Sequence, residues 1–402
     1  MEYVVQKGDT LLKLANRFGV SRESILAQNP FLRKTDYLVP GLMLSLPHAI
    51  VRKYEVQKGD TLPFISEKFG ISGREIIQAN SQLANTSQLT VGEKLIIPFS
   101  VSKSIVQTNQ EYSYKDVRDH LESLKRVYPF ILIDVIGTSV LGKNLYAIRL
   151  GCGKKKVFYS GAWHANEWLT TPVLMKFIED YAAAYSKGIP LRGYNITTLY
   201  SEASIWIVPM VNPDGVELVQ EGIMPECPYY EEVLSINNGS RAFRQWTANI
   251  RGVDLNHQWP ALWEEETSTS PQKPSPCHYG GEKPISEPET QAIYSFTHSH
   301  SFASVLAFHS QGKEIFWGFN GFEPFESEGI AKRLEILSTY CPIQNAGSGA
   351  GYKDWFIQEF RRPGFTIEIG TGVNPLPIEQ FDMIYNQNLS MMLELPFLVD
   401  DY

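Results

Sequence analysis

The sequence predicts an α/β protein: a mixed central sheet with helices on both faces, preceded by two small β-α-α-β modules. The segment YVVQKGDTL at Tyr3–Leu11 recurs as YEVQKGDTL at Tyr54–Leu62, an offset of 51 residues that marks an internal duplication. Beyond residue 112, short apolar runs alternate with segments of helical periodicity. Such alternation is typical of a sheet covered by helices.

The composition restricts the class of protein. The 402 residues are 43% hydrophobic and 20% charged, which is ordinary for a globular chain of several domains. A net charge of −8 argues against a nucleic-acid partner, and the absence of a run of 18 apolar residues argues against a membrane span. The start MEYVVQKGDT lacks the apolar stretch of a signal peptide, so we expect synthesis as a cytoplasmic protein.

The duplication defines two modules, residues 1–48 and 52–99. In each, a short strand leads into Gly-Asp-Thr, where Gly suits a turn and Asp or Thr suits a helix N-cap. Apolar residues at helical spacing follow, and a second helical segment leads to Asn29 or Asn80. An apolar strand then closes each copy.

This pattern resembles the LysM module, a small domain that binds N-acetylglucosamine-containing glycans such as peptidoglycan. The resemblance rests on the QKGDTL start, the central asparagine, and the endings P-G-x-x-L-x-L-P and V-G-x-x-L-x-I-P. It implies peptidoglycan as a partner, and two linked sites would add avidity on a polymer. The candidates for sugar contact are Gly8, Asp9, Thr10, Asn29, Gly59, Asp60, Thr61 and Asn80.

Residues 100–111 form a polar linker, and residues 112–398 form one larger α/β domain. The expected strands are Val157–Trp163, Ile205–Val211, Ser304–Phe308 and Gly364–Ile369. The expected helices are Asp116–Tyr128, Thr170–Tyr185, Glu287–His298, Phe325–Tyr340 and Ile378–Leu395. Ligands in such folds bind at the carboxyl ends of parallel strands, where the candidate functional residues lie.

Two of the expected strands lead into residues that suit a metal. His164-Ala-Asn-Glu167 follows one strand, and His309 follows another. Two imidazoles, a carboxylate and a water make a catalytic zinc set with an open position. An HxxE pattern also arises by chance, with His164 an ordinary loop residue, but the second histidine at an equivalent strand end favours the metal.

The segment beyond residue 112 resembles the zinc carboxypeptidase family. The motifs that carry the resemblance are G-x-H-x-x-E at Gly161–Glu167, G-V-D-L-N at Gly252–Asn256, His309, and T-I-E at Thr366–Glu368. The resemblance implies that His164, Glu167 and His309 bind one Zn²⁺ and that Glu368 is the general base. An ionisable side chain in the apolar strand around Glu368 is costly unless it is used or paired, so the alternative is a salt-bridged strand glutamate.

A positively charged donor is needed for the oxyanion of the reaction. The family uses an arginine upstream of the GVDLN block, and Arg244 is the closest match, with Arg251 and Arg241 as rivals. Asp254 is expected either to orient a zinc-binding histidine or simply to form a turn.

The chain departs from the family at its substrate-binding positions. Asn256-His257 stands where the family has Asn-Arg, and loss of the arginine removes a bidentate fork for a terminal carboxylate. Ala346 occupies the place of the family's aromatic cap, and Lys353 occupies a specificity position where a cation would favour acidic groups. Asn256, His257 and Lys353 together would read a carboxylate-rich stem peptide; the alternative is that Lys353 is a solvated surface residue.

Two LysM-like modules before such a domain resemble the bacterial γ-D-glutamyl-meso-diaminopimelate peptidases, including those associated with sporulation. The implied activity is hydrolysis of that bond in peptidoglycan stem peptides. Without a signal peptide, the protein is expected to act on imported stem peptides, to be released when the producing cell lyses, or to cross the membrane by an unconventional route. The alternatives are a conventional metallocarboxypeptidase, a zinc amidohydrolase on the same fold, and a non-catalytic peptidoglycan-binding protein.

Overall fold

A computed structural model describes residues 104–344 and 349–400 throughout, together with 2–5, 41–45, 52–69, 91–97 and single residues between them. The chain divides into two units, of which the first comprises Met1–Ile105, Glu122–Ile131 and Glu179–Ser201 and the second the remainder. Among these described residues, no helix has the length and apolar character needed to cross a membrane.

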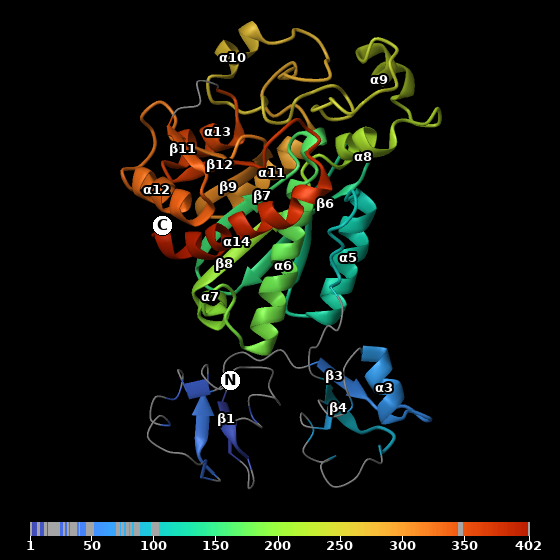
Figure 1. The fold of residues 1–402 in the computed structure, drawn as a ribbon, viewed down its shortest axis with the longest axis vertical. Helices are drawn as coiled ribbons and strands as arrows, with labels where there is room; N and C mark the ends of the chain where they lie inside the picture. The colour runs from blue at the N-terminus through green and yellow to red at the C-terminus, as the bar shows by residue number, and fades with distance from the viewer. Residues whose placement is uncertain are drawn as a thin grey trace. The chain divides into compact units, whose positions relative to one another are not determined.

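Each repeat module pairs its first and last strands in an antiparallel ribbon over a small apolar core (Figure 1). The ribbons are β1 (Glu2–Val4) with β2 (Met43–Ser45), and β3 (Arg52–Glu55) with β4 (Lys94–Ile97). In the second module α3 (Leu62–Phe69) begins after Thr61, whose hydroxyl accepts a hydrogen bond of 3.3 Å from the amide of Phe64. That bond confirms the predicted N-cap.

The central asparagine of each module joins the second helical segment to the closing strand. Asn80 donates to the carbonyls of Ile76 and Ile96 at 2.7 and 2.6 Å, and accepts from the amide of Ile96 at 2.7 Å. Asn29 makes the equivalent three bonds in the first module, and the two residues are 2% and 1% exposed. The prediction that Asn29 and Asn80 contact sugar is therefore wrong, because both amides are buried and used inside the module.

We expect Asn80→Ala to loosen the second module alone. The substitution leaves two carbonyls and one amide of the module without their partner, which costs about 1–3 kcal/mol for each buried group. Hydrogen exchange of the Ile96 amide should accelerate, while the equivalent amide of Ser45 in the first module, held by Asn29, serves as the internal control. Unchanged exchange at Ile96 would contradict this structural role.

The Gly-Asp-Thr turns keep their status as candidates for sugar contact. Asp9 and Asp60 accept hydrogen bonds of 2.6 Å from the hydroxyls of Tyr3 and Tyr54, so part of each carboxylate is used to hold the turn. Thr10, Gly59 and Thr61 are exposed, whereas Gly8 lies outside the described residues. Glycan contact at these turns stays a prediction.

An eight-stranded mixed sheet forms the centre of the larger domain, which confirms the predicted fold class. Its strands in spatial order are β11 (Cys341–Gln344), β10 (Glu314–Trp317), β12 (Gly364–Ile369), β9 (Phe302–Ser310), β7 (Lys155–Ser160), β8 (Ala203–Val208), β6 (Asn144–Gly151) and β5 (Leu132–Thr138). The central strands β12, β9, β7 and β8 are parallel, whereas β10, β6 and β5 run antiparallel to their inner neighbours.

Helices cover both faces of this sheet (Figure 1). The described helices of the larger domain are α5 (Tyr114–Val127), η3 (Ala165–Glu167), α6 (Thr170–Lys187), α7 (Ile196–Glu202), α8 (Pro213–Glu221), α9 (Tyr230–Ile236), α10 (Trp263–Thr269), α11 (Pro288–Ser299), α12 (Glu326–Ser338), α13 (Tyr352–Phe360), η4 (Ile378–Gln380) and α14 (Phe381–Leu398). Neighbouring residues of β7 show the two faces. The Tyr159 hydroxyl donates to the carbonyl of Met392 on α14, whereas the Phe158 ring packs against Phe296 of α11 and Tyr352 of α13.

The predicted helices and parallel strands of the larger domain begin and end within a few residues of the observed ones. Two differences between the predicted and observed strand ends are informative. The strand predicted to end at Trp163 ends at Ser160, because Ala162 adopts a positive φ of 49° and turns the chain. His309 lies inside β9 rather than after it, one residue before its end. Both differences bear on the position of the metal ligands.

Glu289, at the start of α11, makes stability depend on pH. Its carboxylate is buried and accepts a hydrogen bond from the Val140 amide, and burial, with Asp214 and Glu287 adding, raises its pKa from 4.5 to about 8. A raised pKa contributes stability below the unfolded value that is lost as pH rises through the folded value. The protein should thus lose a few kcal/mol between about pH 4.5 and 8, at about 1.4 kcal/mol per pKa unit.

Glu289→Gln should remove that loss, so that the variant gains stability over the wild type as pH rises. Urea unfolding at pH 6 and pH 9 measures the difference. The exposed Glu335→Gln on α12 is a control that should follow the wild type. Identical pH dependence of the wild type and Glu289→Gln would show that Glu289 is not the group responsible.

Candidate metal centre and active site

The loop after β7 brings His164 and Glu167 to one side of a short helical turn. His164 is extended (φ −89°, ψ 138°) and precedes η3, whose last residue is Glu167. Thr170, the first residue of α6, fixes the loop because its hydroxyl accepts from the Ala162 amide at 2.7 Å and donates to the Glu167 carbonyl at 2.9 Å. The turn therefore presents an imidazole and a carboxylate together.

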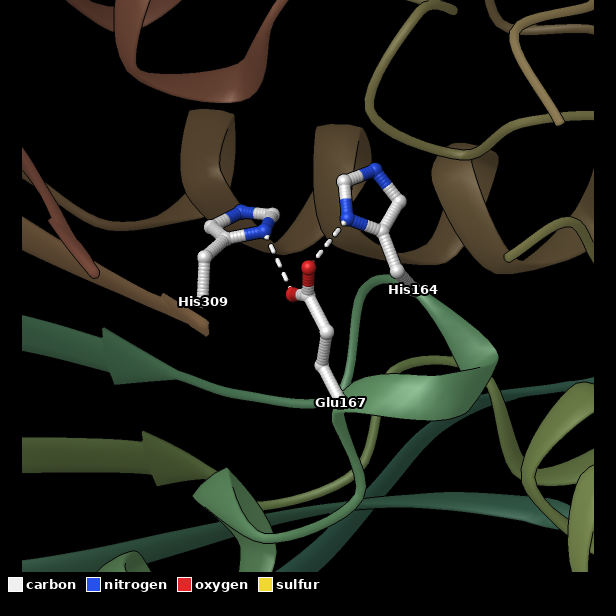
Figure 2. Close-up of side chains that lie close together, drawn as sticks. All are labelled: His164, Glu167 and His309. Carbon is white, nitrogen blue, oxygen red and sulfur yellow. Dashed lines mark hydrogen bonds and ion pairs between the residues drawn. The ribbon is translucent and has the colours of Figure 1, made fainter. Parts of the chain in front are cut away.

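The carboxylate of Glu167 lies between the rings of His164 and His309 (Figure 2). One of its oxygens is 2.9 Å from Nδ1 of His164, and the other is 2.9 Å from Nδ1 of His309. The three predicted ligands thus converge, although Glu167 and His309 are 142 residues apart along the chain. Their candidate ligand atoms all lie within 4.8 Å of one another.

This donor set fits zinc. Two imidazole nitrogens and one carboxylate are the protein ligands of many catalytic zinc sites, which leave a position open for water or substrate. The side chains of His309 and Glu167 are almost fully buried, and that of His164 is 18% exposed. On the far side of the His164 ring, Nε2 is 3.3 Å from Asp254, as expected for a carboxylate that orients a metal-binding imidazole.

The charges in the cluster are strongly coupled. Burial disfavours the ionised form of Glu167, but the two histidines overcome this and lower its pKa to about 2. Burial likewise lowers the pKa of His164, but Glu167 and Asp254 raise it well above its usual value. Burial dominates for His309 and lowers its pKa. Glu167 is consequently an anion, as a ligand for a divalent cation must be.

Glu368 lies next to the cluster on the adjacent strand. In the parallel pairing of β12 with β9, Glu368 stands opposite His309. Its side chain lines a pocket of about 410 Å³, and burial, with the charges of Glu167 and Glu314 adding, raises its pKa well above the usual value. The structure therefore contradicts the alternative of a salt-bridged strand glutamate, since no cation pairs with Glu368 in the described part of the chain.

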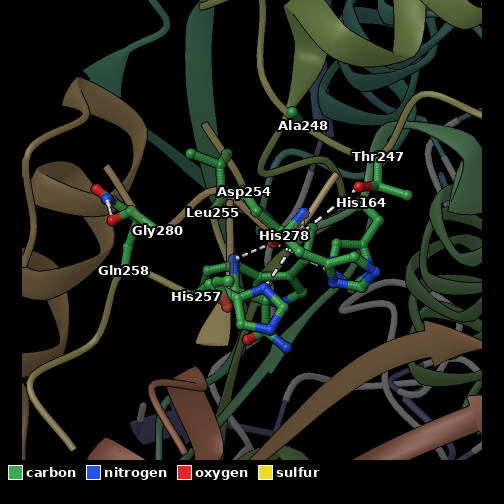
Figure 3. A network of polar contacts seen from close by, with 12 residues as sticks. His164, Thr247, Ala248, Asp254, Leu255, His257, Gln258, His278 and Gly280 are labelled. Carbon is green, nitrogen blue, oxygen red and sulfur yellow. Dashed lines mark hydrogen bonds and ion pairs between the residues drawn. The ribbon is translucent and has the colours of Figure 1, made fainter. Parts of the chain in front are cut away.

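Asp254 is the centre of a polar network that extends from His164 to the predicted substrate residues (Figure 3). It accepts from the backbone amides of Asn256 at 3.0 Å and His278 at 3.1 Å, and it lies 3.3 Å from Nδ1 of His257. Asp254 thus both orients the predicted ligand His164 and forms the turn, so the two roles considered from the sequence are combined.

His257 is a cation at neutral pH although it replaces an arginine. Burial lowers its pKa, but Asp254 and Glu266 on α10 raise it by more, to about 9. The ring of His278 lies with its centroid 5.3 Å from that of His257. This neighbour could not be predicted, because His278 lies in a Pro/Ser-rich loop and has no helical or strand register to place it.

Lys353 belongs to α13, and Asn256 is hydrogen-bonded to the first residue of the same helix. Lys353, the second residue of α13, is 4% exposed; its ammonium donates to the carbonyl of Gly318 and pairs with Asp354. The alternative of a solvated surface lysine is therefore wrong. Asn256 accepts from the amide of Tyr352 at 3.0 Å, which joins it to the start of the same helix. A substrate role for both stays a prediction, and Ala346 lies outside the described residues.

Among the described residues, the predicted oxyanion donor Arg244 pairs with Glu111. Arg244 is 61% exposed and lies 3.5 Å from Glu111. Its rival Arg251 bonds Tyr229 and Glu287, and Arg241 bonds Tyr230, so both are held near α9. The role of Arg244 stays a prediction.

Sequence reasoning missed Asn374, in the loop after β12. Its side chain donates to the carbonyl of Ser310 at 2.7 Å, accepts from the Ser310 hydroxyl at 2.8 Å, and lies 3.5 Å from Glu167. Gln245, which follows Arg244, donates to its carbonyl at 2.9 Å. Asn374 thereby ties the β9 and β12 loops to a metal ligand, but in sequence it resembles any Asn-Pro turn.

Comparison with known proteins agrees with this geometry. The zinc carboxypeptidase family model matches residues 117–390, and the LysM domain model matches residues 3–47 and 54–98. Gamma-D-glutamyl-L-diamino acid endopeptidase 1 of Lysinibacillus sphaericus is 46% identical over 289 residues, which are 72% of this chain and 73% of that protein.

More distant relatives share the fold of the larger domain. Carboxypeptidase B of Astacus astacus is 23% identical over 61% of this chain and 80% of its own length. The crystal structure of thrombin activatable fibrinolysis inhibitor has a TM-score of 0.60 at 18% identity, covering 73% of this chain and 76% of that one. On these matches and the converged His-Glu-His set, the chain belongs to the zinc carboxypeptidase family and carries two LysM domains before its zinc peptidase domain.

Proposed function

We propose that this protein hydrolyses the γ-D-glutamyl–meso-diaminopimelate bond of peptidoglycan stem peptides, with its LysM domains binding the glycan of the same polymer. The observation that carries the proposal is the 46% identity to a protein named for cleavage of γ-D-glutamyl-L-diamino acid bonds. The two LysM domains support peptidoglycan as the partner.

The wall of the site offers cations for a substrate rich in carboxylates. The raised pKa of His257 favours its charged form, and the buried ammonium of Lys353 on α13 pairs with Asp354. Asn256, whose side-chain oxygen is used by the Tyr352 amide, keeps its NH₂ group available to a carboxylate. In place of one arginine fork, the proposal assigns three separate groups to the leaving residue, which favours a substrate with more than one carboxylate over a plain peptide C-terminus.

The reaction needs an activated water, a proton carrier and stabilisation of the developing oxyanion. His164, Glu167 and His309 would hold the zinc, which when bound would lower the pKa of a water and polarise the amide carbonyl. Glu368 takes the proton from the attacking water and then delivers it to the leaving amine. The high pKa of its carboxyl suits this second step, because a group that holds a proton can donate it. Asp254 keeps the His164 ring in the orientation that directs Nδ1 to the site.

Two tripeptides that differ only in linkage test the proposal. One carries D-glutamate joined to meso-diaminopimelate through its γ-carboxyl, and the other carries the α-linked isomer. The zinc-loaded protein should hydrolyse the γ-linked peptide at least 100-fold faster, because the scissile carbonyl of the isomer is displaced from Glu368. Preference for the α-linked peptide would favour a conventional carboxypeptidase, and cleavage of neither would reject the proposed reaction.

A further inference from the structure

One carboxylate beside the active site has no part in the mechanism above. Glu314 on β10 stands directly opposite Glu368 in the antiparallel pairing with β12. Side chains at such paired positions lie on one face of the sheet with Cβ atoms about 5 Å apart, and like charges there are destabilising. Two glutamates in this arrangement therefore cost stability that a structural role does not explain.

The same two glutamates line the pocket of about 410 Å³ next to the metal ligands. Its described lining also includes Ser310, Gln311, Phe316 and Asn374, and it holds no basic side chain. Lys313, the neighbour of Glu314 in sequence, directs its ammonium to Met383 on α14. Glu368 is half-buried and lines this pocket without a hydrogen bond from any described residue. The pocket is thus a negatively charged space of the size that ligands occupy.

The proposed function assigns this pocket to the acyl side of the scissile bond. The residues expected to hold the leaving diamino acid, Asn256, His257 and Lys353, do not line it. Its lining comes instead from the residues that follow His309, from β10 and from the loop after β12. In the proposed substrate the acyl side is L-alanyl-γ-D-glutamate, whose one cationic group is the amino terminus of the alanine when that amine is free.

We propose that Glu314 binds the free ammonium at the amino terminus of the acyl dipeptide, so that the enzyme prefers stem peptides already released at that end. The inference rests on the proposed function. The inference also implies an earlier reaction. In that reaction, the amide between the alanine amine of the stem peptide and the acyl group attached to it is hydrolysed, which supplies the preferred free-amine substrate. Phe316, next along the same face of β10, provides an apolar wall for the alanine side chain.

The test compares L-Ala-γ-D-Glu-meso-diaminopimelate with its N-acetyl derivative, in the zinc-loaded full chain. For the wild type, kcat/KM should be at least about 10-fold higher for the free amine, the value of one charge-assisted hydrogen bond. Glu314→Gln should bring this ratio close to 1 by slowing only the free-amine substrate. Glu314→Asp should keep part of the preference, and Glu335→Gln, an exposed change on α12, should keep all of it.

The inference is overturned, while the proposed function stands, if the wild type cleaves both peptides at equal rates. It is also overturned if Glu314→Gln keeps the wild-type ratio of kcat/KM for the free-amine and acetylated peptides, whether both rates fall equally or neither falls. An equal loss would mean that Glu314 acts through Glu368 or through the fold, since the acetylated peptide has no ammonium to lose. Cleavage of neither peptide by the wild type rejects the proposed function, and the inference falls with it.

Discussion

Glu368→Gln should reduce kcat on the γ-linked stem tripeptide by on the order of 10²–10⁴, the usual contribution of a positioned general base. The amide has nearly the same shape as the carboxyl but cannot take a proton from water. Glu368 shares the end of the sheet with His309 but belongs to a separate strand and is not one of the converged ligands. The variant should therefore bind zinc as the wild type does.

The measurement pairs steady-state kinetics with zinc content and thermal unfolding of the same samples. Removal of an unpaired carboxyl opposite Glu314 should leave the melting temperature unchanged or raise it, because a like-charged cross-strand pair is relieved. A fall in activity below 10-fold, with zinc bound, would exclude Glu368 as the base. A fall accompanied by loss of zinc would instead place its effect on the metal.

Glu167→Ala should abolish stoichiometric zinc and, with it, activity. Both oxygens of this carboxylate face the rings of His164 and His309, so the substitution removes one ligand and leaves two partly buried imidazoles without their partner. A ligand that binds only the folded state raises stability by mass action. Zinc should therefore raise the melting temperature of the stripped wild type and should leave that of Glu167→Ala unchanged.

Asp254→Asn provides a graded comparison for the metal site. Asp254 contacts Nε2 of His164 and is not itself a member of the His164, Glu167 and His309 set, so its loss should weaken zinc binding by about 10–100-fold rather than eliminate it. Chelator competition measures both variants. If Glu167→Ala keeps one zinc per chain at the affinity of the wild type, the assignment of the metal centre to this cluster is wrong.

Much of the fold was predictable because apolar residues are regularly spaced in helices and strands that bury one face or are buried completely. The 51-residue repeat, the long helices α6 and α14, and the fully buried strands β8 and β9 all have clear patterns. The edge strand β11 and its neighbour β10 were missed because they have only four residues each, and β10 alternates half-buried and buried positions over those four residues. Glu314 went unnoticed for the same reason.

The metal ligands were predictable because their residue types and their order in the chain are specific. The residues that surround the ligands were not predictable. The asparagines of the two modules appeared as sugar contacts, since a polar residue repeated in a short module suggests function; burial shows that Asn29 and Asn80 hold the module together. His278 and Asn374 lie in loops whose approach to Asp254 and Glu167 depends on tertiary contacts over 24 and 207 residues. No local pattern in the chain encodes such approaches.

Identification of the products of L-Ala-γ-D-Glu-meso-diaminopimelate by mass spectrometry tests the central claim most directly. The wild-type protein with zinc should release L-Ala-D-Glu and free diaminopimelate, and Glu368→Gln at the same concentration should release neither. Cleavage at the L-Ala–D-Glu bond would contradict the assignment of this site to the γ-D-glutamyl amide. So would a result in which the γ-linked tripeptide stays intact while the α-linked isomer is cleaved.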